Sequence, residues 1–267
     1  MAEFGRLVLP PLRQLGSQNP GHAYRLRPTQ SVSVMLPLHD FATTRTARYA
    51  LSGEPGPGIR SVWFCLHDAD QSVTDLAAQL APIEAPERLL VLPEGLSRYT
   101  VPGNSLAEVP HLAAAWLAPG SGDLLPDLTD LTAYLDALAE HILAQCPPDV
   151  SCTVLGYGQG AAAACRWLSG NRFNYERLIL YAGVFPPDFD RRATLVSLPE
   201  RPVTVVATTV DTYTPEAAGE GLVQDLLDVG LPAALRLVTP GPITLAALGP
   251  AADGQSVEHS PTPDPTT

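Results

Sequence analysis

Several side chains that could do chemistry follow apolar, strand-like runs of the sequence. Cys65 lies near the end of one such run and is followed by His67, Asp68 and Asp70, while Asp211 follows another. Carboxylates beside an imidazole or a thiol can transfer protons or support attack on a carbonyl carbon, and clustered carboxylates can hold Ca²⁺ or Mg²⁺. Because parallel sheets bind ligands at the carboxyl ends of their strands, these residues are the first candidates for a functional site.

Short apolar runs alternate with helical patterns through the middle of the chain, and this alternation predicts the elements that position the candidates. Strands are predicted at 61–66, 88–92, 151–155, 177–181, 203–207 and 234–238, with an earlier antiparallel strand at 46–51. Helices are predicted at 128–145, 159–168 and 215–229, the last capped by Thr214. The pattern predicts the α/β class, with a mostly parallel central sheet and helices on both faces.

The two ends of the chain differ from this middle part. Residues 1–44 are rich in proline and poor in periodic pattern, which predicts an irregular N-terminal extension, with 31–36 as a candidate edge strand. Residues 251–267 have almost nothing to bury and are predicted to be a disordered tail. The predicted α/β domain therefore covers residues 45–250.

Three of the loops carry landmarks in a fixed order. Leu66-His67-Asp68-Ala69-Asp70-Gln71 follows the first core strand, Gly156-Tyr157-Gly158-Gln159-Gly160 opens an alanine-rich helix, and Asp211 lies in the stretch 208–215. Supporting phrases are 93–99, Ala115-Trp116 and 133–136. Together they resemble the phospholipase/carboxylesterase group of bacterial serine esterases over roughly residues 46–248. The resemblance implies the α/β-hydrolase fold.

The resemblance also implies a Gly-x-Ser-x-Gly nucleophile elbow and a histidine after the last strand. Here Gly156 and Gly160 keep the flanking positions, but Gly158 stands where the serine belongs, so no acyl-enzyme can form there. The stretch 237–244, which corresponds to the histidine loop, contains no histidine. His259, in the polar tail, is the only downstream histidine, and we expect no imidazole base at this site.

By position in the resembled family, the backbone amides of Ala69 and Gln159 would form the oxyanion hole. Asp68 and Asp70 replace glycines of the family pattern, and we expect their charges to repel a developing oxyanion. Asp211 occupies the position of the triad acid, although a turn role ahead of the following helix is the alternative. His67 has a structural role in the family pattern.

These observations predict a pseudoenzyme, which is a non-hydrolytic binding or scaffold protein on an esterase frame. It is expected to bind a small ester-like or acyl ligand in a cleft above Gly158. Tyr157, Trp116, Tyr99 and Tyr213 are the expected lining, and core or rim packing is the alternative role for these aromatic residues. No cofactor is expected.

Two other functions stay open at this point. The chain could be an active carboxylic-ester hydrolase with a rebuilt site, in which Cys65 or Thr212 attacks and Asp68 or Asp70 acts as a base. Alternatively, Asp68, Asp70 and Asp211 could converge on a cation, although their spacing matches no metal motif.

The composition narrows the class of protein. Lys plus Arg is 16 against 28 for Asp plus Glu, a net charge of −12, which argues against nucleic acid as a partner. Every basic residue is arginine, a pattern typical of salt-rich cytoplasm or of codon bias alone. No apolar stretch reaches about 20 residues and no signal-peptide pattern is present, so a cytoplasmic protein without membrane contact is expected. Four cysteines without a Cys-x-x-Cys pair are expected to be buried thiols.

Overall fold

The computed structural model describes residues 39, 41–102, 110–116, 125–186, 190–208 and 216–249. The chain divides into two units, residues 1–41 and 42–267, and the fold below belongs to the second unit. The candidate edge strand at 31–36 and the predicted tail at 251–267 lie outside the described residues. Within the described part, no helix has the length and apolarity of a membrane span.

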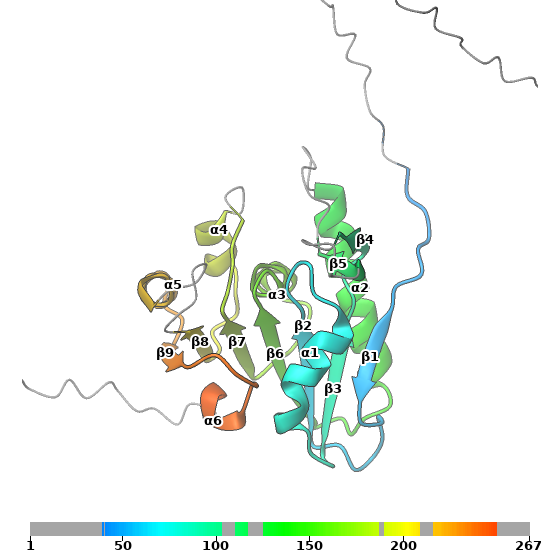
Figure 1. Ribbon diagram of the computed structural model, residues 1–267, viewed down its shortest axis with the longest axis horizontal. Helices are drawn as coiled ribbons and strands as arrows, with labels where there is room; N and C mark the ends of the chain where they lie inside the picture. The colour runs from blue at the N-terminus through cyan, green and yellow to red at the C-terminus, as the bar shows by residue number, and fades with distance from the viewer. Residues whose placement is uncertain are drawn as a thin grey trace, which may run out of the picture. The chain divides into compact units, whose positions relative to one another are not determined.

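A seven-stranded sheet forms the centre of this unit, in the order β1-β3-β2-β6-β7-β8-β9 (Figure 1). Neighbouring strands run parallel, except that β1 is antiparallel to β3. This arrangement confirms the mostly parallel sheet and the early antiparallel strand that the sequence predicts. The strands are β1 Tyr49–Ser52, β2 Ser61–Leu66, β3 Arg88–Pro93, β6 Ser151–Tyr157, β7 Arg177–Tyr181, β8 Val203–Thr208 and β9 Ala233–Val238.

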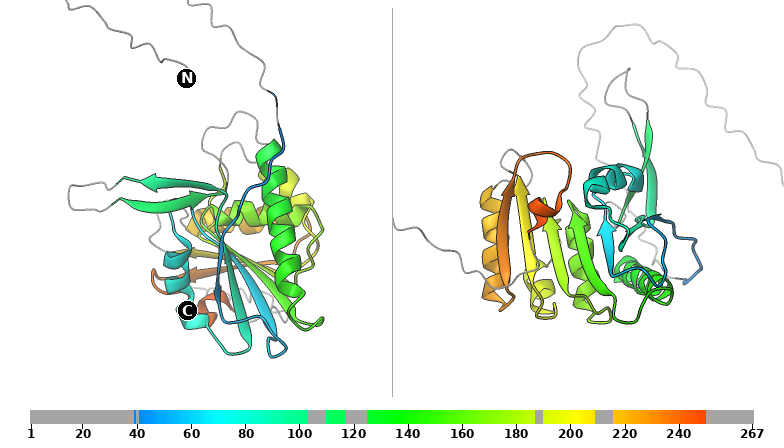
Figure 2. Two further views of the ribbon diagram at one scale, coloured as in Figure 1. Left: turned by 90° about the vertical axis from the view of Figure 1, so that its right-hand side faces the viewer. Right: turned by 90° about the horizontal axis from the view of Figure 1, so that it is seen from below.

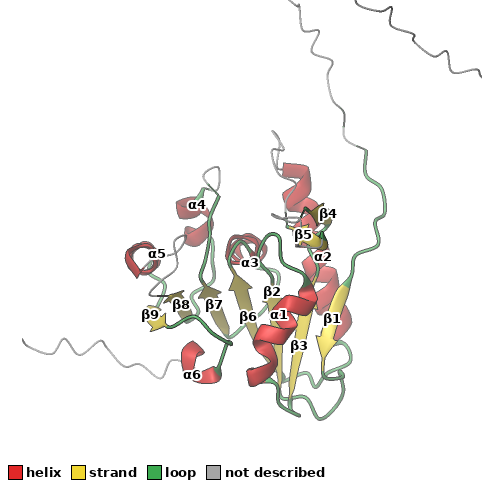
Figure 3. Cartoon of the chain, in the orientation of Figure 1, coloured by secondary structure: helices red, strands yellow, loops and turns green. Residues whose placement is uncertain are grey.

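Helices cover both faces of the sheet, as Figure 3 shows by colour. One face packs against α2 (Leu125–Leu143), α3 (Gly160–Ser169) and α5 (Glu216–Asp228), with the short α4 (Arg191–Val196) beside α3 and α5. The other face packs against α1 (Val73–Leu80), the 3-10 turn η1 (Ala81–Ile83) and α6 (Leu245–Leu248). The short elements α1, η1, α4 and α6 are absent from the sequence-based prediction.

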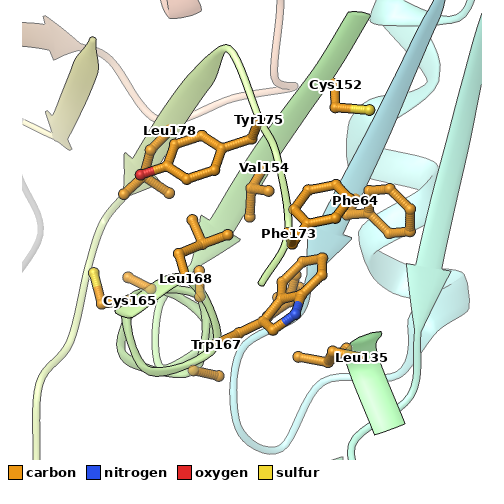
Figure 4. Close-up of a cluster of buried hydrophobic side chains, with 14 of the residues drawn as sticks. Phe64, Leu135, Cys152, Val154, Cys165, Trp167, Leu168, Phe173, Tyr175 and Leu178 are labelled. Atoms are coloured by element: carbon orange, nitrogen blue, oxygen red, sulfur yellow. The ribbon is translucent and has the colours of Figure 1, made fainter. Parts of the chain in front are cut away.

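An aromatic cluster fixes α3 against the sheet (Figure 4). The Phe64 ring of β2 lies edge-on to Trp167 and Phe173 at centroid distances of 5.6 and 5.2 Å, and Trp167 stacks on Phe173 at 4.6 Å. Burial of each such side chain contributes roughly 1.5–3 kcal/mol. The indole N–H of Trp167 donates to Asp136 of α2 at 2.8 Å, which ties α2 to α3. The turn that precedes α3 is therefore held by a rigid helix.

A separate antiparallel ribbon, β4 (Ser97–Val101) with β5 (His111–Ala115), follows β3 (Figure 2). The sequence-based prediction lacks this ribbon. A bridge between Gln71 and Ala114 ties it to the loop after β2. As a result, Tyr99 of β4 and Trp116, directly after β5, reach the loop that carries Asp68 and Asp70.

Candidate functional site

The turn from β6 into α3 has the geometry of a nucleophile elbow. Gly158 has φ of +55°, in the left-handed region, and its N–H donates to the Tyr181 carbonyl of β7 at 3.0 Å. A Cβ on Gly156 would lie 2.5 Å from the Cα of Ala161, and one on Gly160 would overlap the Leu66 carbonyl. The flanking glycines are therefore required by close packing, while the left-handed φ explains why the turn itself favours a glycine.

The Asp68 side chain lies over this elbow. Its Oδ1 accepts hydrogen bonds from the backbone N–H of Ala69 at 2.8 Å and from that of Gln159 at 2.7 Å. These are the two amides that the resemblance assigns to an oxyanion hole, and here they converge on one oxygen that belongs to the protein itself. A Cβ built on Gly158 would overlap the same carboxylate. The sequence predicts only that Asp68 repels an oxyanion from nearby. In the structure, its carboxylate occupies the position between the two donors.

His67 and Trp116 fix the loop that carries Asp68. The His67 side chain is fully buried, its Nδ1 donates to the Asp68 carbonyl at 2.6 Å, and its Nε2 accepts from the Gly95 N–H at 3.0 Å. The Trp116 indole N–H donates to the His67 carbonyl at 2.7 Å. Burial lowers the pKa of His67, against weaker opposing effects of the Asp68 carbonyl and Glu94. Since both ring nitrogens have partners, His67 is held as a neutral structural group.

Asp70 has different partners from Asp68. Its Oδ1 accepts the Tyr99 hydroxyl proton at 2.5 Å, and its own N–H donates back to the same hydroxyl oxygen at 3.1 Å. Burial raises the pKa of Tyr99, and the hydrogen bond to the Asp70 side chain raises it further. Among the described residues, no three His, Cys, Asp or Glu side chains gather where they could hold a metal ion. Asp211, the third member of the cation hypothesis, lies outside the described residues.

Cys65 is enclosed in the core below this loop. Its side chain has no exposed surface, and burial alone raises the pKa of its thiol well above the usual range. Its Sγ is 3.8 Å from the Trp63 carbonyl oxygen. A neutral, enclosed thiol has neither the charge nor the access that nucleophilic attack requires.

Three of the four aromatic residues proposed for a single cleft are described, and they have different surroundings. Tyr157 stacks on Tyr181 at 5.3 Å, and both line a hollow of about 550 Å³ at the carboxyl ends of β6, β7 and β8. Trp116 lines another cavity, of about 490 Å³, against α2. Tyr99 is bound to Asp70 as described. Tyr213 lies outside the described residues, as do Thr212 and His259.

Solved structures of esterases share this arrangement of strands and helices. Esterase PE8 is 18% identical, with 74% of this chain and 91% of that chain covered and a TM-score of 0.55. A carboxylesterase from Mesorhizobium loti is 19% identical (73% and 87% covered, TM-score 0.53), and one from Bacillus cereus is 17% identical (76% and 90% covered, TM-score 0.51). The chain has the α/β-hydrolase fold. No family model and no curated protein sequence matches the chain.

In this α/β-hydrolase fold, Gly158 lies in the turn between β6 and α3, and the amides of Ala69 and Gln159 both donate to Asp68 Oδ1. Sequence reasoning missed the partners of the loop: Tyr99 on Asp70, the His111 imidazole 3.2 Å from the Asp70 carbonyl, and the Gln71 side chain, which accepts from the Asp68 N–H at 3.0 Å. The only sequence signal for these contacts is the segment 93–99, which ends in Tyr99. The resemblance uses this segment to identify the family and does not indicate what its residues contact.

Proposed function

We propose that this chain is a non-hydrolytic protein on the α/β-hydrolase fold, which acts by binding and whose oxyanion pocket is closed by its own Asp68. The observation that carries the proposal is the pair of hydrogen bonds from the Ala69 and Gln159 amides to Asp68 Oδ1. An ester carbonyl would need these same two donors to be polarised and then stabilised as an oxyanion.

The competition between Asp68 and an ester favours Asp68. Hydrogen bonds to a charged group contribute about 1.5–3 kcal/mol each, more than those to a neutral carbonyl. Asp68 is also part of the chain, so it competes at a high effective concentration and pays no association entropy. A tetrahedral intermediate formed beside it would place a second negative charge next to a carboxylate.

The described residues also lack two groups that a serine esterase uses, a nucleophile at the elbow and a histidine after the last strand. Gly158 provides no nucleophilic atom, and the described loop after β9 contains no histidine. Loss of the nucleophile alone lowers turnover in serine hydrolases by on the order of 10⁶, and further losses add little because the groups act together. These deficits support a binding role over an enzymatic one.

The rebuilt-hydrolase alternative has less support. Cys65 is enclosed in the core, and the raised pKa of its thiol keeps it protonated. Asp68 already accepts hydrogen bonds from two backbone amides. Asp70 is bound to the Tyr99 hydroxyl. None of the described members of that hypothesis is therefore placed to attack an ester or to activate water.

The hollow beside Tyr157 and Tyr181 is our candidate for the ligand site. Its described lining residues are uncharged, with Thr208 and Pro240 among them, and its volume of about 550 Å³ suits a small organic molecule. We propose a neutral ester-like or acyl ligand for it, because a charged ligand would find no counter-charge among these described residues.

Turnover of p-nitrophenyl acetate by the full chain, at low and at molar NaCl, tests the proposal. We expect rates equal to those in buffer for the unaltered protein and for Asp68→Asn and Asp70→Asn, with circular dichroism as the check of folding. Turnover by the unaltered protein that disappears in a folded Asp68→Asn variant would refute the proposal and assign catalysis to Asp68.

A second experiment tests directly the two hydrogen bonds that Asp68 Oδ1 accepts. Asp68→Ala removes the carboxylate and leaves the Ala69 and Gln159 amides facing a vacated space. We expect acetate, at constant ionic strength, to raise the melting temperature of Asp68→Ala but not that of the unaltered protein or of Asp70→Ala, because the freed donors bind a carboxylate. Equal responses of all three proteins would contradict the occupied oxyanion pocket.

A further inference from the structure

The sheet face under α1 and α6 changes character along its strands. Towards the carboxyl ends it is apolar, with Cys65, Leu92 and Leu155 in the core. At the amino ends the same face carries hydroxyl and guanidinium groups, where a covered parallel sheet ordinarily carries apolar side chains. These polar residues are Ser61, Arg88, Ser151, Thr153, Arg177 and Thr204. The opposite face at the same level is apolar throughout, with Val62, Leu89 and Leu178.

A cavity of about 580 Å³ lies over this polar area, which we call the arginine pocket. Its wall includes Arg88, Arg177, Thr153 and Ser151 from the sheet and Leu245 from α6. The pocket lies at the amino ends of the strands, at the opposite end of β2 and β6 from Asp68 and Gly158. It is therefore separate from the candidate site above and independent of the function proposed for it.

Arg177 is deeply buried and held in one position. Only 8% of its surface is exposed, its Nη1 donates to the Gly249 carbonyl at 3.0 Å, and its Nη2 donates to Thr204 Oγ1 at 3.0 Å and to the Leu248 carbonyl. Its Nε has no hydrogen-bond partner among the described residues. The guanidinium is thus positioned at the pocket wall; its Nε is itself buried, and one Nη1 hydrogen has no described acceptor and is left for a ligand.

One further guanidinium group, that of Arg88, lines the same pocket, and a third, that of Arg236, lies close to the pocket residue Gly249. Arg88 lies over the Trp63 ring, with its Cζ 5.2 Å from the ring centroid, and its buried Nε also lacks a partner in the described part of the chain. The Arg236 guanidinium packs against Gly249, beside the carbonyls that Arg177 binds. Glu176 also lines the pocket, but none of the three arginines forms a salt bridge with it or with another described carboxylate.

This gathering of positive charge is unfavourable without an anion. Burial lowers the pKa of Arg177, and repulsion from Arg236 lowers it further, although an arginine stays charged at neutral pH. Two arginines that line one pocket, with a third nearby and no salt bridge to a described carboxylate, are an arrangement that an external anion would stabilise.

We propose that the arginine pocket binds a phosphate dianion, either free or carried on a small organic molecule. Guanidinium groups match the tetrahedral oxygens of phosphate with paired, charge-assisted hydrogen bonds, and the hydroxyls of Ser61, Ser151 and Thr153 supply further donors at the wall. The pocket's volume exceeds that of a bare phosphate and leaves room for a small organic body.

Calorimetric titration of the full chain with inorganic phosphate and with glycerol 3-phosphate, at an ionic strength held constant with NaCl, tests this proposal. We expect saturable binding, weakened at least about tenfold in Arg88→Gln, since one charged hydrogen-bonding partner is lost. Arg192→Gln, which removes an exposed arginine on α4, is the matched control and should bind as the unaltered protein does. Tighter binding of glycerol 3-phosphate than of phosphate assigns the organic form, and equal binding assigns the free ion.

Arg177→Met would remove the anchor of α6 along with the charge, so Arg88→Gln, which spares that anchor, is the deciding variant. The proposal is overturned if phosphate gives no saturable heat, or if a folded Arg88→Gln binds it as tightly as the unaltered protein. Equal weakening by Arg192→Gln would also overturn it, because the effect would then reflect overall charge and not this pocket.

Discussion

Asp68 and Gly158 depend on each other. The carboxylate occupies the space that any side chain at the elbow would need, and the elbow's next amide holds the carboxylate in place. Glycine at position 158 therefore has two effects. It removes the nucleophile, and it leaves room for the Asp68 carboxylate, which fills the space that a side chain would take. The state of this site is set by two residues that lie far apart in the sequence.

Gly158→Ser tests this dependence at the residue scale. We expect a loss of roughly 1–3 kcal/mol in the free energy of unfolding, because a non-glycine residue at φ of +55° is strained and its Cβ overlaps Asp68. Urea unfolding measures it, with Gly56→Ser, which meets open space, as the control. Adding Asp68→Gly should recover part of the loss; strictly additive effects of the two substitutions would argue against the overlap.

Cys65 gives a second test at this scale. Because burial raises the pKa of its thiol and encloses it, we expect no labelling by iodoacetamide at pH 8 in the native protein and rapid labelling in urea. Cys146 is partly exposed and should be labelled first. Mass spectrometry of peptides distinguishes the two. Native labelling of Cys65 at the rate of Cys146 would mean that the core below the loop opens readily.

At the scale of elements, the loop after β2 is held from three sides. His67 bridges the loop to Gly95, Trp116 binds it from the end of β5, and Tyr99 binds it from β4. The β4–β5 ribbon therefore has a positioning role, since two of these contacts come from it. Loss of the ribbon's packing would release Asp68 from the elbow.

The buried His67 makes the stability of this loop depend on pH. Its folded pKa lies below the unfolded value of 6.5, so the unfolded chain binds a proton first as the pH falls. The contribution is fully present above about pH 6.5 and is lost as the pH falls towards the folded pKa. We expect the free energy of unfolding to decrease from about pH 7 to pH 5, and less steeply in His67→Gln. His141→Gln should keep the slope of the unaltered protein, and identical slopes in all three would contradict the assignment.

How much of these elements the sequence predicts depends on the kind of signal. Apolar runs locate β2, β3, β6, β7 and β8 to within about two residues, because a strand buried on both faces must be apolar. The edge strand β9 is located equally well, although it is only partly buried. The helix α1 also carries a usable signal, a capping box between Ser72 and Asp75. The β4 strand has only five residues, Ser97–Val101, and no continuous apolar run, so that signal does not mark it. Asp68 in the oxyanion pocket is unpredictable from local pattern, since its partner Gln159 follows a different strand.

For the whole molecule, the net charge of −12 is the dominant long-range feature. Self-repulsion of that charge opposes folding, and salt screens it over a Debye length of about 8 Å at physiological ionic strength. We expect NaCl up to about 0.5 M to raise the melting temperature by a few degrees, on the order of 1 kcal/mol. Scanning calorimetry measures this rise. A melting temperature that falls with added NaCl would show that attractive ion pairs outweigh the net repulsion.

The order of strands in the sheet has a consequence for how the chain folds. β1, β3 and β2 form one side of the sheet, and β6, β7, β8 and β9 form the other side in the order of the sequence. Within each side, the paired strands are therefore close together in the sequence. Within the described sheet, the only strand pairing between the two sides is that of β2 with β6, Ser61 opposite Ser151, which closes by far the longest loop in the sheet. Because such distant pairing costs the most chain entropy, docking of β2 on β6 should limit the folding rate. The site at the carboxyl ends of these two strands would therefore form last, when the two sides meet.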